Sequence, residues 1–195
     1  MIKNFTPKPL PRSYAWVAEQ AAGYGPNLMR EALKTYGLTE TRGAGNTSEI
    51  LDMADALGGV IEDFYTKDSI PWCGLAVSYW ILMAGFEPPK NFSQVRARDF
   101  ALWGIPSDRP SFGDVLVFWR GSPAGRDGHV GLYVAEDDNY YYVLGGNQSD
   151  QVNIAKLDKN RLLAARRCPW RIRQPDGVQP LIISEVTGEV SVNEA

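Results

Sequence analysis

The chain has 195 residues, and its formal net charge of −3 and pI near 5.2 argue against nucleic acid as the main partner. Hydrophobic residues make up 44 % of the sequence, which is enough for the core of one domain with tails. The longest apolar stretch, at 75–84, is too short to span a bilayer, so we expect no membrane insertion.

Three prolines, at positions 7, 9 and 11, predict an extended N-terminal arm over residues 1–12. This segment lacks the apolar run of a secretory signal, so we expect a protein that is made in the cytoplasm without a signal peptide. Any action outside the cytoplasm would then need another route of delivery.

Residues 13–174 are predicted to form one domain, whose first half is helical. Apolar residues at helical spacing predict helices over 14–22 and 28–36, and a third that is capped by Thr47 and ends near 58–59. A fourth helix, with Pro71 in its first turn and Gly85 at its end, is apolar on both sides and should be buried all round. A short fifth helix is predicted over 93–103.

The hydrophobic period changes to that of strands after a turn at 110–114. Strands are predicted over 115–119, 130–135 and 140–144, with weaker candidates over 152–155 and 164–167. Helices first and an antiparallel meander second predict an α+β fold, with the helical half packed on one face of the sheet.

The remaining segment, 175–195, is predicted to be a β-prone tail outside the domain. Its residues 181–192 could add a strand to the edge of a partner's sheet. We therefore expect the tail, together with the N-terminal arm, to dock the protein onto a larger assembly.

The only histidine, His129, stands at the start of a predicted strand, and Cys73 stands where a loop turns into the fourth helix. Nucleophile, base and orienting amide then follow one another as Cys73, His129 and Asn147, the set that a thiol acyl-transfer enzyme needs. A thiol in the first turn of a helix faces free N–H groups and the positive end of the dipole, which favours the thiolate. His129 would add to this effect and then protonate the leaving amine.

Asn147 follows Gly145 and Gly146 at the end of a strand, and we expect its side-chain carbonyl to hold the imidazole in one orientation. The backbone N–H of Cys73 is expected to stabilise the oxyanion. Three aromatic residues are candidates for substrate binding, with a place in the core as the alternative for each: Trp72, Trp119 and Tyr133.

No metal or other cofactor is expected. One histidine and two distant cysteines do not make the three-ligand site of a catalytic zinc enzyme, which argues against a zinc amidase. The second cysteine, Cys168, is interpreted as a buried structural thiol.

Several short motifs taken together resemble the phage-associated branch of the NlpC/P60 and CHAP peptidoglycan hydrolases. They are PWCG at 71–74, RAR at 96–98 before WG at 103–104, RGS at 120–122, GHVG at 128–131 and LGGNQSD at 144–150. The match covers about residues 14–170. It implies a papain-like α+β fold, with Cys73 similar to the family nucleophile, His129 to its base and Asn147 to its third polar residue.

The resemblance further implies a cysteine-dependent enzyme that cleaves an amide in the peptide part of the bacterial wall. Two activities stay open, a D,L-endopeptidase and an N-acetylmuramoyl-L-alanine amidase, because Trp72 and Gly74 flank the nucleophile where many NlpC/P60 members have Asp and Ser. The expected partners are peptidoglycan and the proteins of a phage tail or delivery particle.

The expected role is phage lysis or tail-associated entry, with action in the periplasm or the cell wall, reached from the cytoplasm or inside a virion. The alternatives are a wall-amidase toxin delivered by a secretion system and a structural virion subunit that keeps the same fold.

Overall fold

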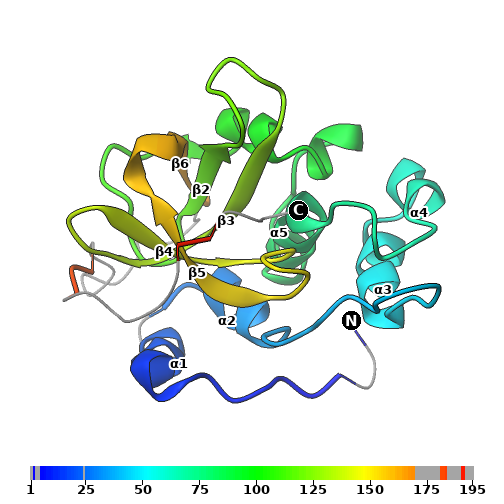
Figure 1. Ribbon diagram of the computed structural model, residues 1–195, viewed down its shortest axis with the longest axis horizontal. Coiled ribbons are helices and arrows are strands. Elements are labelled where there is room, and N and C mark those ends of the chain that lie inside the picture. The colour runs from blue at the N-terminus through cyan, green and yellow to red at the C-terminus, as the bar shows by residue number, and fades with distance from the viewer. Residues whose placement is uncertain (1, 3–4, 24, 170–180, 184–189, 192–195) are drawn as a thin grey trace.

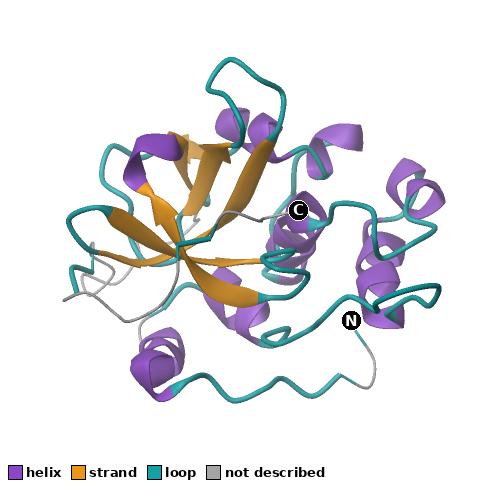
Figure 2. Ribbon diagram, viewed as in Figure 1, coloured by secondary structure: helices purple, strands orange, loops and turns teal. Residues whose placement is uncertain are grey.

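The computed structural model describes residues 2, 5–23, 25–169, 181–183 and 190–191 (Figure 1). The last residues of the predicted domain, 170–174, and most of the predicted tail lie outside these described residues. Within them the chain forms helices and one six-stranded antiparallel sheet, which confirms the α+β class (Figure 2).

The first half of the chain is helical, as predicted. Its α-helices are α1 (Ala15–Gly23), α2 (Asn27–Leu33), α3 (Ser48–Leu57), α4 (Val60–Phe64) and α5 (Cys73–Met83). Short 3-10 helices are η1 (Arg12–Tyr14), η2 (Asn91–Gln94), η3 (Ala97–Leu102) and η4 (Lys159–Arg161).

Three details of the helical half differ from the prediction. Helix α4 was not expected. The helix predicted over 93–103 is two 3-10 helices, because the chain is extended at Arg96, with φ −89° and ψ 107°, between η2 and η3. Thr47 occupies the N-cap position of α3, but its hydroxyl donates to the Thr39 carbonyl at 2.8 Å instead of capping the helix.

The second half forms the sheet. Its strands are β1 (Ile105–Pro106), β2 (Val115–Trp119), β3 (Gly128–Glu136), β4 (Tyr140–Gly145), β5 (Asn153–Asp158) and β6 (Leu162–Arg167), in the order β1-β6-β2-β3-β4-β5. Strands β2 to β5 are the predicted meander. Strand β5 lies at one edge of the sheet, and β6 pairs with β2 on the other side of β3 and β4. The short helix η4 is the only connection between β5 and β6, so the sheet has to curl on itself to bring these strands close together (Figure 1).

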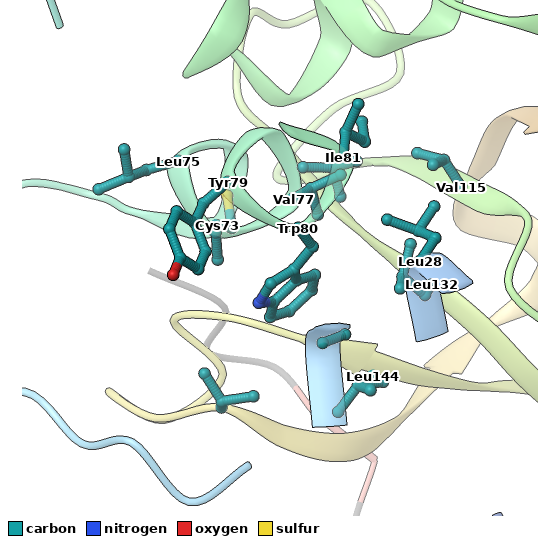
Figure 3. Close-up of a cluster of buried hydrophobic side chains, with 14 of the residues drawn as sticks. Leu28, Cys73, Leu75, Val77, Tyr79, Trp80, Ile81, Val115, Leu132 and Leu144 are labelled. Atoms are coloured by element: carbon teal, nitrogen blue, oxygen red, sulfur yellow. The ribbon is translucent and has the colours of Figure 1, made fainter. Parts of the chain in front are cut away.

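Helix α5 is the centre of the core. It packs against α2 and α3 and against β3 of the sheet, and every residue from Cys73 to Ile81 is buried. Figure 3 shows its side chains gathered with Leu28 of α2 and with Leu132 and Leu144 of the sheet. The prediction of a helix buried all round is confirmed, and this packing fixes the position of Cys73 at the start of α5.

A smaller core lies on the other face of the curled sheet. It consists of Leu116, Phe118, Tyr133, Tyr141, Val143, Leu157 and Ala165, with Leu162 packed against it. The sheet thus has an apolar layer on both faces, and only one of them is covered by α5.

Both terminal segments pack on the chain's own domain where the structure describes them. In the arm, the Lys8 N–H donates to the Tyr36 carbonyl at 2.9 Å. In the tail, the Glu136 N–H donates to the Leu181 carbonyl at 2.8 Å, and the Ser191 N–H donates to Lys156 of β5 at 3.0 Å. These bonds give the described parts of both segments partners within the domain, and docking onto a larger assembly stays a prediction.

Candidate active site

Cys73 is the first residue of α5 and lies against the segment that leads into η3. A Cβ atom at the next residue, Gly74, would lie 2.5 Å from the Val95 carbonyl oxygen, so only glycine allows this approach. Trp72 is the N-cap and makes no side-chain capping bond. The sulfur of Cys73 is therefore placed where the backbone N–H groups at the start of α5 have no helical partner.

The surroundings of the Cys73 sulfur act in opposite directions on its ionisation. Cys73 is only 6 % exposed, and this burial raises the pKa of its thiol above the ordinary value. Hydrogen bonds from the N–H groups of Gly74 and Val130, and the charge of Arg120, lower that pKa by less than burial raises it. The N–H groups at the helix start do favour the thiolate, as expected, but burial outweighs them, so the net change in the pKa of Cys73 is upward.

His129 is fully buried near the start of β3, and its Nε2 lies 3.0 Å from Oε1 of Gln148. The Gln148 amide cannot be reversed, because its Nε2 donates to the carbonyls of Val143 and Asn153 at 3.2 and 2.7 Å. Oε1 is an acceptor only, so His129 Nε2 carries the hydrogen. In the neutral ring, Nδ1 is then the nitrogen that can accept a proton.

The two glycines at the end of β4 bring the histidine and the start of α5 together. A Cβ atom on Gly145 would lie 3.0 Å from His129 Nε2, and one on Gly146 would lie 2.8 Å from the Trp72 ring. The backbone at 145–146 therefore lies against both His129 and Trp72. Larger residues at these two positions would push His129 and the start of α5 away from each other. Strand β3 also brings Cys73 near His129, because the N–H that bonds to the sulfur belongs to Val130, the residue after His129.

Asn147 does not make the bond that the sequence suggested. It is 2 % exposed and has a left-handed backbone with φ 55°, and its Oδ1 is buried with no hydrogen-bond partner among the described residues. Its neighbour Gln148 holds the imidazole instead. Sequence reasoning missed Gln148, although it is the second amide of the same GGNQ run.

A pocket of about 570 Å³ opens at Cys73. Its walls are Pro71 and Cys73, the segment 95–99 and parts of the loop between β2 and β3. Cys73 lines this pocket and His129 does not, so the sulfur is the site residue that a ligand in the pocket would meet.

None of the three aromatic residues proposed for substrate binding lines the pocket. Trp72 is fully buried and donates its indole N–H to Glu40 at 3.2 Å. Tyr133 is fully buried in the smaller core, and the half-buried Trp119 donates to the Asn160 carbonyl at 3.2 Å. Their positions favour the structural alternative for each.

Cys168 is 1 % exposed, and burial, assisted by the nearby charge of Asp114, raises the pKa of its thiol to about 12. Its position agrees with its interpretation as a buried structural thiol. Within the described ranges, no group of three or more His, Cys, Asp or Glu residues is placed to hold a metal ion. Nor does that part of the chain contain a helix with the length and apolar character needed to cross a membrane.

The site thus combines a buried thiol, a histidine fixed in one tautomer and a pocket that reaches the sulfur. Known proteins add nothing to this description, since no model of a protein family matches the chain and no curated protein is significantly similar to it in sequence.

Proposed function

We propose that this chain is a cysteine hydrolase with a papain-like NlpC/P60 or CHAP fold, which cleaves an amide bond in the peptide part of bacterial peptidoglycan. The observation that carries the proposal is the fixed tautomer of His129 beside the strand residue that contacts Cys73. A histidine whose Nε2–H is held by an amide, so that Nδ1 is the nitrogen able to accept a thiol proton, has the arrangement that nucleophilic catalysis by cysteine requires.

The proposed reaction starts from the neutral thiol. Nδ1 of His129 takes the proton from Cys73 as the sulfur attacks the carbonyl carbon, and the resulting imidazolium donates through Nε2 to Gln148. The backbone N–H of Cys73 would stabilise the oxyanion. The imidazolium then protonates the leaving amine, and water hydrolyses the thioester to free the carboxylate and restore the thiol.

The raised pKa of Cys73 fits this order of events. A buried neutral thiol is a poor nucleophile until a base removes its proton. If the base removes that proton only when substrate is bound, the sulfur is protected from oxidation and alkylation in the free protein. Substrate that fills the pocket would also exclude water from the reacting atoms.

The choice of peptidoglycan as substrate rests on the sequence motifs around Cys73, His129 and Asn147. Both bonds named from the sequence, the D,L-peptide bond and the bond between muramic acid and L-alanine, remain candidates. A role in phage lysis or entry is the favoured context, and a secreted wall toxin would use the same chemistry.

Digestion of purified peptidoglycan, followed by mass spectrometry of the new ends, tests this function. A new amine within the stem peptide indicates an endopeptidase, and a free lactyl group with a new L-alanine amine indicates an amidase. Cys73→Ala should abolish the products, whereas Cys168→Ala, which removes a buried thiol that does not line the pocket, should retain them. Intact peptidoglycan after treatment with the wild-type protein would leave a structural virion subunit as the better reading.

A further inference from the structure

The pocket beside Cys73 has a charge opposite to that of the chain. Its lining contains Arg96, Arg98, Arg120 and Arg126, against only Asp99 and Asp127, in a protein whose net charge is −3. Within the part of the chain that the structure describes, no salt bridge joins any of these arginines to a carboxylate. The lining of the pocket therefore carries more positive than negative formal charge.

One of the four arginines has a structural role. Arg98 donates to the carbonyls of Ser122, Pro123 and Asp127, at 2.7, 2.9 and 2.8 Å, and so holds the loop between β2 and β3 against η3. All of its guanidinium nitrogens are engaged by the backbone. Arg98 builds the wall of the pocket and leaves the other three arginines to meet a ligand.

The other three arginines line the same pocket as the sulfur of Cys73. Arg120 is half-buried and close enough to lower the pKa of Cys73, and Arg126 is exposed on the loop. Arg96 is exposed beside Phe92, with its guanidinium carbon 6.0 Å from the ring centroid. Guanidinium groups in a recess are strong, often bidentate, partners of carboxylates, and the walls of a cleft focus their field on a bound anion.

We propose that this pocket binds a free carboxylate of the peptide substrate, next to the amide that Cys73 attacks. The inference rests on the proposed function and deepens it, because it selects acidic wall peptides over those in which the carboxylate is amidated. A carboxamide has the same shape but no charge, and it keeps only one acceptor oxygen, so its NH2 group would face the arginines with donors against donors. The pocket volume lies within the range of about 300–1,000 Å³ that is usual for ligand sites.

The test compares two synthetic stem peptides, one with a free glutamate carboxylate and one with the corresponding carboxamide. Calorimetry with the full-length Cys73→Ala protein measures binding without cleavage, and we expect the acidic peptide to bind about 10- to 100-fold more tightly. The double variant Arg96→Gln/Arg126→Gln, made in the same background, should remove most of this preference. Arg12→Gln, an exposed arginine outside the pocket, is the matched control and should retain it.

Equal affinity for the two peptides, binding of neither, or an unchanged preference in the double variant would overturn the inference. A separate digestion of peptidoglycan by the wild-type protein separates the two claims. A carboxylate preference without hydrolysis contradicts the proposed function alone, and hydrolysis without a preference contradicts the pocket assignment alone.

Discussion

Replacing Gln148 should release the single histidine from its fixed tautomer. In the alternative tautomer the bare Nε2 lone pair would face the Gln148 oxygen across 3.0 Å, which leaves two buried acceptors without a donor. Each unsatisfied buried group costs about 1–3 kcal/mol, so the observed tautomer is favoured by about 2 kcal/mol or more, a ratio of at least about 30 to 1. Gln148→Met keeps a side chain of similar length and removes this preference.

Nitrogen NMR of the imidazole measures the tautomer directly, and it does so whether or not the protein is an enzyme. Because His129 is the only histidine, one set of ring signals is expected, and it should report a protonated Nε2 in the wild-type protein at a pH where the ring is neutral. Gln148→Met should give a mixture. If the protein hydrolyses peptidoglycan, kcat should fall about 10- to 150-fold, since a hydrogen bond to a charged group contributes about 1.5–3 kcal/mol.

Asn147→Gly is the matched control for this variant. Glycine adopts the φ of 55° found at Asn147 without strain, so the substitution removes the neighbouring amide and keeps the backbone. We expect a wild-type tautomer and nearly full activity. A single Nε2–H tautomer that persists in Gln148→Met, or a mixture that appears in Asn147→Gly, would refute the assignment and return the orienting role to Asn147.

The remaining predictions concern the alkylation of the two thiols, the resistance of the activity to a metal chelator and the stability that the Asp114–Arg167 pair provides. Because burial raises the pKa of Cys73, alkylation by iodoacetamide should increase with pH through and above about 8.5, as mass spectrometry of the labelled peptide would show, with Cys168 unlabelled in the folded protein. A rate that levels off near pH 6 would mean that a low-pKa ion pair exists after all. Peptidoglycan hydrolysis should survive EDTA and be lost to iodoacetamide, and activity that zinc restores after chelation would contradict the proposed chemistry. Asp114 is 2 % exposed and accepts two hydrogen bonds from the Arg167 guanidinium. Asp114→Asn should therefore lower the free energy of unfolding, measured in urea, by about 2–3 kcal/mol. This loss is smaller than for a fully buried ion pair, because the Arg167 side chain is 35 % exposed. Asp108→Asn, an exposed neighbour, should change it by less than about 0.5 kcal/mol, and similar losses in the two variants would contradict this role of Asp114.

Local patterns were sufficient to predict the elements that carry the site. The apolar residues of α5 and the strand periods of β2, β3 and β4 are properties of short segments, and all four elements were predicted within a few residues. The return of β6 to pair with β2 was not predicted, because pairing between strands far apart in the chain leaves no local periodicity. The two-residue β1 was missed for the same reason.

The details of the site depend on three-dimensional surroundings that the sequence does not display. Asn147 and Gln148 are adjacent amides, and the left-handed backbone at Asn147 decides which of them faces His129. The ionisation of Cys73 was predicted from its position in the helix, whereas the outcome depends on how much of the sulfur the neighbouring segments cover. Trp72 and Tyr133 were candidates for substrate binding, but both belong to the core. Trp72 is covered at the start of α5, and Tyr133 is covered in the smaller core on the other face of the sheet.

The pairing of the tail with the sheet bears on the solubility of the protein. An edge strand with free N–H and carbonyl groups is a template for strand-to-strand aggregation. At one edge of this sheet, the segment 190–191 bonds to β5, and at the other edge β1 is short and ends in Pro106, which has no N–H to offer. Each edge of the sheet thus offers fewer free backbone groups to another strand. A protein truncated before residue 181 would expose more of β5, and we expect it to aggregate more readily at high concentration.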